Sequence, residues 1–315
     1  MSDIVRQLRE RAKSQVKKIV FPEARDQRVI EACQYLTKEG IADCLLLGPA
    51  DMEPAKKKEF AKAFLKSAKA GQIGQEEALK LMDDPLYYAA MMLRSGQAEG
   101  LVAGATHTTS SVIRAAIKCF EIDKRMGIVS SCSIMVVPDC IYGEKGTFVF
   151  ADCGVIPRPS GEQLAKIAIS SAEFAKTILG LEPKVAFLSF STKGSSKNKW
   201  TTNVQEAVEI AKAKDSGFLI DGELQADSAI VPEVAERKLK DSKVAGIANV
   251  LIFPNLESGN ISYKLIQRLA RARAIGPVLL GTKQLCSDLS RGCSAEDIID
   301  STAVTAIRAQ ERSKE

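Results

Sequence analysis

The chain has 315 residues, more than one hydrophobic core usually needs, so we expect two domains or one elaborate α/β domain. Apolar residues make up 45% and charged residues 26%, which is typical of folded globular proteins and excludes disordered and fibrous ones. The net charge of +5 is spread along the chain without basic blocks. Nucleic-acid binding is therefore not indicated, whereas small anionic substrates suit this charge.

The start of the chain lacks the apolar core of a signal peptide, and no run approaches the roughly 18 apolar residues of a membrane span. We therefore expect a cytoplasmic protein with no membrane association. Eight cysteines are scattered without a C-x-x-C pair, which favours reduced thiols over disulfides. The single histidine, His107, excludes zinc sites and serine triads that are built on several histidines.

Short apolar runs alternate with longer segments of helical period along most of the chain. Strands are expected at 17–23, 41–49, 98–106, 130–138, 146–154, 184–190, 218–224, 249–255 and 276–281. Turn residues join the fourth and fifth runs, which predicts a hairpin. Elsewhere helical segments separate the strands, such as the one that begins with the capping box from Ser160 to Gln163. This alternation predicts α/β architecture with mainly parallel sheets and right-handed crossovers.

Ligands of parallel α/β sheets bind beyond the carboxyl ends of the strands. Four loops at such ends combine glycine with small polar side chains: GATHTTS (104–110), SFSTKGSSK (189–197), FPNLESGN (253–260) and GTKQLCSDLSRG (281–292). Donors of such loops approach an anion closely. None has the spacing of a nucleotide-triphosphate loop, and no G-x-G-x-x-G follows a strand, so ATP and NAD are disfavoured. A smaller phosphate or carboxylate is the expected ligand.

Four basic side chains, His107, Arg94, Arg125 and Lys193, have both a structural and a functional interpretation. His107 follows a strand directly, but no orienting carboxylate is evident nearby, so we expect it to bind ligand or shape its loop rather than transfer a proton. Arg94 ends an amphipathic helix, where it interacts with the helix dipole or offers a planar fork to phosphate. Arg125 is a similar, weaker case. Lys193 either neutralises phosphate or is simply solvated.

The stretch DLSRGCSAEDIID, residues 288–300, also has two interpretations. Ser294 to Asp297 fits the capping box that begins a helix. Ser290, Arg291 and Asp297 also suit a reaction site. The two are compatible, because a turn that carries Ser290 and Arg291 to a helix start also directs backbone N–H groups at a phosphate.

Taken together, the loops resemble the phosphate acetyltransferase family, within the broader phosphate acetyl/butyryl transferase group. The stretches that carry the resemblance are FPEARDQRVIEA, VAGATHTT, FADCGVIP with PSGEQLAKIA, SFSTKGSSK, DGELQADSAIVPEVA, NVLIFPNLESGN and DLSRGCSAEDI. The resemblance implies two α/β/α domains with an interdomain cleft, similar to the isocitrate and isopropylmalate dehydrogenase fold, and usually a homodimer. The implied domains are 1–140 plus 281–315, and 141–280.

The resemblance further implies a reversible reaction in which acetyl-CoA and phosphate give acetyl phosphate and CoA, with no metal and no tightly bound cofactor. Asp297 matches the base that takes the thiol proton, and Ser290 matches a hydrogen-bond donor to the carbonyl oxygen. Arg291, with Arg94, matches the arginines that hold the phosphoryl group. We expect direct thiolate attack in a ternary complex. The full set of expected substrate-binding residues is Arg94, Arg125, His107, Thr108, Ser191, Thr192, Lys193 and Gly194.

Three alternatives remain open from the sequence. A butyryl or other short-chain acyl transferase of the same group differs only in pocket volume. A decarboxylating dehydrogenase of the related fold needs a divalent metal and NAD(P). A catalytically silent regulatory module is expected to lose the serine, arginine or aspartate, all three of which are present here.

Overall fold

The computed structural model describes residues 3–67, 73–214 and 217–314. The chain forms two compact units, which we describe separately: unit 1 contains residues 3–123 and 282–314, and unit 2 contains residues 124–281. Residues 124–140, assigned to the first domain from sequence, lie in unit 2. They do so because they contain β4 (Ser130–Val136), which pairs with two other strands of that unit. The predicted α/β class with mainly parallel strands is confirmed.

Unit 1 is built on four parallel strands in the order β2-β1-β3-β10. They are β1 (Lys17–Phe21), β2 (Ala42–Leu46), β3 (Gly100–Ala103) and β10 (Cys286–Asp288). The first three were expected. The fourth, β10, lies in a stretch that we read as a loop, because three residues are too few for a period of two to be recognised.

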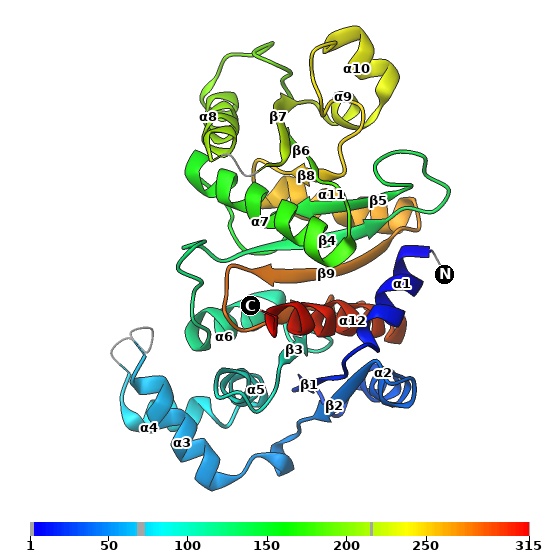
Figure 1. The fold of residues 1–315 in the computed structure, drawn as a ribbon. Helices are drawn as coiled ribbons and strands as arrows, with labels where there is room; N and C mark the ends of the chain where they lie inside the picture. Colours follow the sequence, from blue (N-terminus) through cyan, green and yellow to red (C-terminus); the bar gives the residue numbers. More distant parts are fainter. Residues whose placement is uncertain (1–2, 68–72, 215–216, 315) are drawn as a thin grey trace. The chain divides into compact units, whose positions relative to one another are not determined.

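The helices of unit 1 lie around this sheet, and several of them contact its strands directly (Figure 1). They are α1 (Asp3–Ala12), α2 (Gln27–Lys38), α3 (Pro54–Leu65), α4 (Gln75–Leu81), α5 (Pro85–Arg94), α6 (Thr109–Cys119) and α12 (Ala295–Arg312), with a short 3-10 helix at Pro49–Asp51. The C-terminal helix α12 contacts α1, α2 and the strands, and it is buried over most of its length. Helix α5 instead contacts α6, β3 and β1.

Unit 2 has a mixed sheet in the order β9-β4-β5-β8-β6-β7. Its remaining strands are β5 (Thr147–Ala151), β6 (Lys184–Leu188), β7 (Leu219–Leu224), β8 (Val250–Ile252) and β9 (Arg273–Leu280). The predicted hairpin is confirmed, because β4 and β5 pair in antiparallel fashion. Strand β9 is also antiparallel to β4, so only β5, β8, β6 and β7 form a parallel series.

The helices of unit 2 are α7 (Gly161–Leu179), α8 (Lys199–Ala213), α9 (Ala226–Ile230), α10 (Pro232–Lys238) and α11 (Leu256–Leu269). Helix α7 packs on β5, β8 and β6, whereas α11 packs on β4, β5 and β9. Ser160 and Gln163 form the expected capping box at the start of α7.

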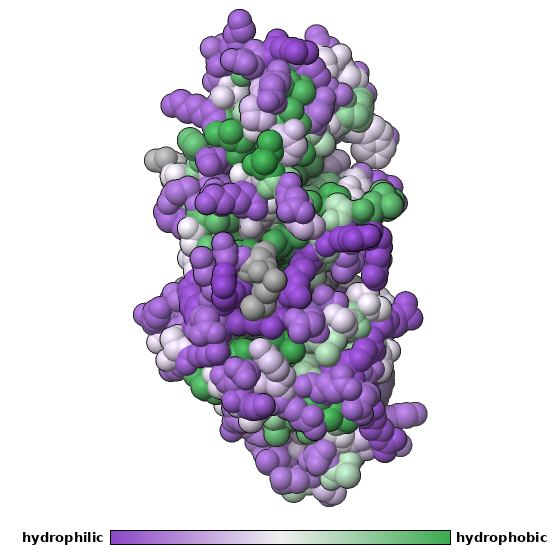
Figure 2. Space-filling view, turned by 90° about the vertical axis from the view of Figure 1, so that its right-hand side faces the viewer, coloured by the Kyte–Doolittle hydropathy of each residue, from purple (hydrophilic) through white to green (hydrophobic). Residues whose placement is uncertain are grey.

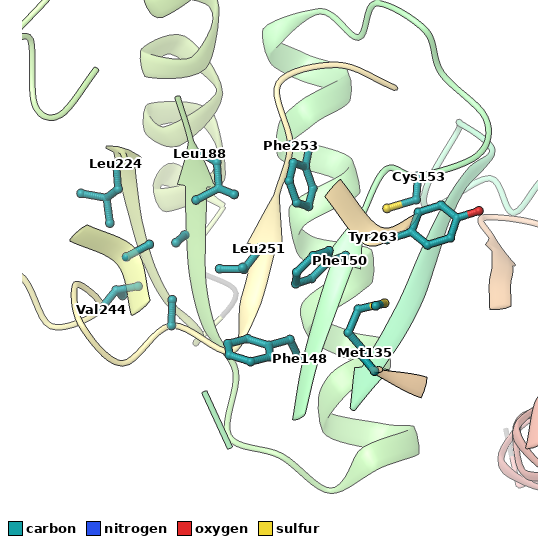
Figure 3. Packing of buried hydrophobic residues seen from close by; sticks show 14 residues of the cluster. Met135, Phe148, Phe150, Cys153, Leu188, Leu224, Val244, Leu251, Phe253 and Tyr263 are labelled. Atoms are coloured by element: carbon teal, nitrogen blue, oxygen red, sulfur yellow. The ribbon is translucent and has the colours of Figure 1, made fainter. Parts of the chain in front are cut away.

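A core of aromatic and aliphatic side chains fills one side of the unit 2 sheet (Figure 3). The Phe150 ring lies 6.2 Å from the Phe148 ring and 5.1 Å from the Phe253 ring, in tilted arrangements that favour attraction between aromatic rings. Tyr263 of α11 packs on the same cluster, beside the buried Cys153. This core anchors β5 and β8, whose carboxyl ends carry loops of interest below.

Hydrophilic side chains cover most of the face shown in Figure 2, with hydrophobic ones in separate small groups. None of the described helices is long and apolar enough to cross a membrane. Each of the eight cysteines is a thiol rather than half of a disulfide.

Candidate functional site

The carboxyl ends of three parallel strands bring three loops together in unit 1. Residues after β1 include Glu23, residues after β3 form the loop 104–108, and residues after β10 begin the loop 289–294. Hydrogen bonds join all three, as described below. The sequence analysis expected a site at this edge of the sheet, and the structure places His107, Ser290 and Arg291 there.

The loop 104–108 is wrapped around the carboxylate of Glu23, which is buried. Glu23 Oε1 accepts hydrogen bonds from the backbone N–H groups of Thr106 (2.7 Å) and His107 (2.9 Å). Oε2 accepts from those of Ala105 (2.9 Å) and Gly104 (3.1 Å). From the sequence we expected these donors to face an anionic ligand. They are instead taken by an anion of the chain itself.

Glu23 also orients the imidazole of His107. The distance from His107 Nδ1 to Glu23 Oε1 is 2.8 Å, so the orienting carboxylate that the sequence did not reveal is present. This hydrogen bond raises the pKa of His107, against the effect of partial burial. Burial alone raises the pKa of Glu23, but the hydrogen bonds from His107 and the backbone outweigh it and lower the pKa to about 2. His107 Nε2 has no partner within the described part of the chain, so it remains available to a ligand.

Gly104 allows the 104–108 loop to lie against the end of β10. Its φ of +120° suits glycine, and an added Cβ there would lie 2.4 Å from the carbonyl oxygen of Leu289.

A buried carboxylate, Asp288, lies beside Gly104: a Cβ added to Gly104 would lie 2.7 Å from Oδ1 of Asp288. Neither oxygen of Asp288 makes a hydrogen bond of ordinary geometry. Burial raises the pKa of Asp288 to about 7, and the charge of Glu23 adds to the rise, whereas Thr109 opposes it. Asp288 therefore titrates near neutral pH.

Arg28, in the first turn of α2, connects the loop 104–108 with the loop 289–294 through hydrogen bonds. Its Nη1 donates to the carbonyl oxygens of Arg291 and Cys293, both at 2.9 Å, and its Nη2 donates to that of Ala105 at 2.9 Å. Asp26 holds the guanidinium through a 2.7 Å ion pair. In the sequence, neither Glu23 nor Arg28 of the stretch FPEARDQR was expected to act at the site. The missed signal was a glutamate just after a strand end, followed by an arginine in the first turn of the next helix.

Ser290 and Arg291 are exposed on the loop that Arg28 fixes. Ser290 Oγ accepts from the N–H of Gly292 at 3.3 Å, which leaves the hydroxyl proton available to a ligand. The capping box is confirmed: Asp297 Oδ2 accepts from the N–H of Ser294 (2.8 Å), and Ser294 Oγ accepts from that of Asp297 (3.2 Å). Among the described residues, Asp297 Oδ1 has no hydrogen-bond partner. The turn therefore presents a hydroxyl, a guanidinium and a carboxylate oxygen.

Arg94 is not brought to this loop. Its Nη1 donates to the carbonyl oxygen of Cys119 at 3.3 Å, at the C-terminal end of α6. Thr108 is the N-cap at the opposite end, where its Oγ1 accepts from the N–H of Ser111 at 3.1 Å. Helix α6 has 11 residues, so about 16 Å separates its ends. The local interactions of Arg94 are those of a residue that caps a helix end.

The expected binding residues of unit 2 lie on and near the loop after β6. Buried Glu223 accepts from the hydroxyl of Ser191 (2.9 Å) and from the N–H of Gly194 (2.7 Å). Lys193 forms an ion pair with Asp221, and its Nζ also donates to the carbonyl oxygen of Gly222 at 2.9 Å. As in unit 1, an internal carboxylate takes the donors of a glycine-containing loop.

Two further candidates of unit 2 lie in contrasting environments. Thr192 Oγ1 accepts from the N–H of Gln225 at 3.1 Å, which ties the same loop to the end of β7. Arg125, 68% exposed, lies 3.4 Å from Glu173 of α7. In residues 3–67, 73–214 and 217–314, no group of three or more histidine, cysteine, aspartate or glutamate side chains is placed to hold a metal ion.

Comparisons with known proteins agree over nearly the full length of the chain. The family described as Phosphate acetyl/butaryl transferase matches residues 3–306. The chain is 48% identical to a phosphate acetyltransferase of Thermoanaerobacterium thermosaccharolyticum, over 98% of this chain and 99% of that protein. It is 46% identical to one of Acetivibrio thermocellus, over 96% and 97%.

Solved structures give the same result. A phosphotransacetylase from Streptococcus pyogenes has a TM-score of 0.89 at 38% identity, and covers 99% of this chain and 100% of its own. The EutD phosphotransacetylase from Staphylococcus aureus has a TM-score of 0.82 at 36% identity, with 98% of each chain covered.

Proposed function

The chain belongs to the phosphate acetyl/butaryl transferase family and is a transferase, and we propose that it moves an acetyl group reversibly between CoA and inorganic phosphate. The observation that carries the proposal is the turn after β10, which presents Ser290, Arg291 and Asp297 together. The reaction needs a base for the thiol proton, a donor to the carbonyl oxygen and a cation for the phosphoryl group, and these three side chains can supply them. A silent module is expected to lack one of them.

Asp297 is the proposed base. A CoA thiol becomes a strong nucleophile once it loses its proton, and Oδ1 of Asp297 has a free lone pair to accept it. The thiolate sulfur then attacks the acetyl carbon of acetyl phosphate. A carbon–sulfur bond forms, the bond from the acetyl carbon to the phosphate oxygen breaks, and phosphate leaves with the bonding electrons. The proton on Asp297 is returned to phosphate, so the enzyme ends unchanged.

Ser290 and Arg291 are the proposed groups that stabilise charge. Attack places negative charge on the carbonyl oxygen, to which the Ser290 hydroxyl donates. The Arg291 guanidinium holds the phosphoryl oxygens while the bond to phosphate breaks. Arg28 contributes indirectly, because its hydrogen bonds to the carbonyl oxygens of Arg291 and Cys293 fix the turn before substrate arrives. We favour direct transfer in a ternary complex, since the chain has no second histidine to activate Ser290 as a covalent nucleophile.

His107 is a proposed anion donor in the same site. Glu23 holds its Nδ1 and favours the charged imidazolium, which leaves the Nε2 proton to donate to a substrate oxygen. Substrate-binding roles for Thr108, Ser191, Thr192, Lys193, Gly194 and Arg125 stay predictions, whereas the hydrogen bond from Arg94 to the carbonyl oxygen of Cys119 favours a structural role for Arg94. The proposal also includes a homodimer in the cytoplasm, CoA as substrate and no tightly bound cofactor.

The test is CoA-dependent thioester formation from acetyl phosphate after thorough chelation, with butyryl phosphate in parallel. Efficient acetyl-CoA formation is expected, with a lower kcat/KM for butyryl phosphate. Preference for butyryl phosphate would instead favour the other activity in the family's description. Failure with both substrates would leave the chain a transferase-family member that binds without turnover.

A further inference from the structure

Two large aromatic side chains of unit 2 are exposed beside each other at one small pocket. Phe190 is 61% exposed and Trp200 is 57% exposed. Both line a pocket of about 270 Å³ whose other walls include Arg158, Asn203 and Pro254. Leaving such rings in water forgoes the free energy of burying them, so a pocket of this composition is suited to a flat apolar ligand.

The pocket lies where ligands of parallel sheets bind. Phe190 follows the end of β6, and Pro254 follows the end of β8, the strand paired in parallel with β6. Trp200 stands in the first turn of α8, just beyond the SFSTKGSSK loop. Part of the wall therefore comes from two adjacent carboxyl ends and one helix start, and Arg158 comes from the segment between β5 and α7. The polar residues of the SFSTKGSSK loop suggested an anion site from the sequence, whereas Phe190 and Trp200 carried no predicted role.

Cations flank the exposed indole. Lys199 Nζ lies 4.7 Å from the centre of the Trp200 ring, and the Arg158 guanidinium carbon lies 5.9 Å from it. The amide nitrogen of Asn203 donates to the carbonyl oxygen of Pro159 at 3.2 Å, and its amide oxygen has no partner among the described residues. A ligand at this pocket would thus meet aromatic faces, a hydrogen-bond acceptor and adjacent positive charge.

We propose that this pocket binds the adenine ring of CoA, with its phosphates beside Lys199 and Arg158. The inference rests on the proposed function, since it takes CoA as the substrate. Adenine offers a flat ring for stacking and an exocyclic amine that donates to Asn203 Oδ1, and it is attached to phosphates that complement the cations. At about 270 Å³ the pocket suits one part of a large ligand, because whole ligands of drug size occupy about 300–1,000 Å³. Acetyl phosphate has no aromatic ring to stack.

Trp200 is the only tryptophan of the chain, so its fluorescence reports on this pocket directly. Adenosine 3′,5′-bisphosphate, which carries the base and phosphates without the thiol, is expected to change that fluorescence in a saturable way that excess CoA reverses. Phe190→Ala keeps the reporter and is expected to weaken the binding of this probe about tenfold. No saturable change in the wild type would overturn the proposal.

Kinetics separate the pocket from the chemistry. With CoA as acceptor, Trp200→Ala is expected to raise KM about tenfold, equivalent to about 1.4 kcal/mol, while kcat stays near the wild-type value. With pantetheine, which has the thiol but no nucleotide, the same variant is expected to match the wild type. Trp200→Phe, which keeps an aromatic face, is the matched control and should restore most of the CoA affinity.

Equal effects of Trp200→Ala on CoA and pantetheine, or none on either, would contradict the adenine assignment. A protein that forms no acetyl-CoA at all would instead refute the proposed function. The fluorescence titration would still decide the pocket in that case, because it requires no turnover.

Discussion

Two glycine-containing loops, 104–108 in unit 1 and the one after β6 in unit 2, each surround a buried glutamate, but the groups that bind the two carboxylates differ. Glu23 accepts four backbone N–H groups and the ring of His107, whereas Glu223 accepts a backbone N–H and the hydroxyl of Ser191. The first carboxylate therefore holds an imidazole, and this hydrogen bond raises the pKa of His107, whereas the second carboxylate holds a hydroxyl. The backbone donors of a glycine-containing loop can thus bind a carboxylate of the chain itself, while a side chain of the same loop, here His107, stays available to a ligand.

The largest effect that distinguishes the two regions is expected at the serines. Ser290→Ala should lower kcat about 10²-fold or more, because it removes a donor to the developing oxyanion. Ser191→Ala is the matched control in unit 2 and should leave kcat within a few-fold, since its hydroxyl already donates to Glu223. Initial-rate kinetics with acetyl phosphate and CoA measure both. Equal losses in the two variants would remove the contrast between the loops.

The glutamates themselves should have large effects on stability. Glu23→Gln places an amide N–H₂ against backbone donors, so we expect unfolding by urea to become easier by about 1–3 kcal/mol. Glu223→Gln, in the other loop, should cost about the same. Only Glu23→Gln should also raise KM for acetyl phosphate, because it misplaces His107. A similar rise in Glu223→Gln would show that the unit 2 loop orders the acetyl phosphate site as well.

The pH dependence of His107 should separate the loops further. Because the chain has one histidine, its imidazole signals in NMR need no assignment, and they should titrate above 6.5 in the wild type and lower in Glu23→Gln. The groups near this pair include Asp84, Asp288 and Arg28, and they influence the titration through their charges. Glu223→Gln should leave the curve unchanged. A wild-type pKa at or below 6.5 would contradict the assignment.

The same pair predicts two pH windows for stability. The raised pKa of His107 means that its contribution to the free energy of unfolding is complete below about 6.5 and is lost as pH rises through the folded-state value. The lowered pKa of Glu23 means that its contribution is present above about 4.5 and is lost as pH falls towards 2. Urea unfolding at several pH values should show both losses in the wild type. Glu23→Gln should weaken both slopes.

The smallest effect is expected for Arg94. Arg94→Gln removes one hydrogen bond to the carbonyl oxygen of Cys119, so stability should fall by about 1 kcal/mol and KM for acetyl phosphate should stay unchanged. The family resemblance predicted the opposite, a raised KM. A raised KM with normal stability would show that Arg94 reaches phosphate during turnover despite its place at the far end of α6.

Local patterns predicted most of the fold. Apolar runs and helical periods located nine of the strands, and the capping boxes at Ser160 and Ser294 formed as expected. The pairing of β4 with β9 was not predictable, because register between distant strands leaves no local pattern. Residue types after the strand ends identified His107 and the DLSRG turn as candidates. Glu23, which orients His107, lies 81–84 residues before the groups that it binds. Arg28, which fixes the DLSRG turn, lies 263 residues before Arg291, so neither contact leaves a local pattern in the sequence.

The most direct test of the account is the turnover of Asp297→Asn in acetyl-CoA formation at saturating acetyl phosphate and CoA, with far-UV circular dichroism and unfolding midpoint as controls for folding. Asparagine still accepts the N–H of Ser294 through its amide oxygen, so the helix cap and the fold should persist. We expect a kcat at least about 10²-fold below that of the wild type, because the thiol has lost its base. A folded Asp297→Asn with near-normal kcat would contradict it and remove Asp297 from the chemistry.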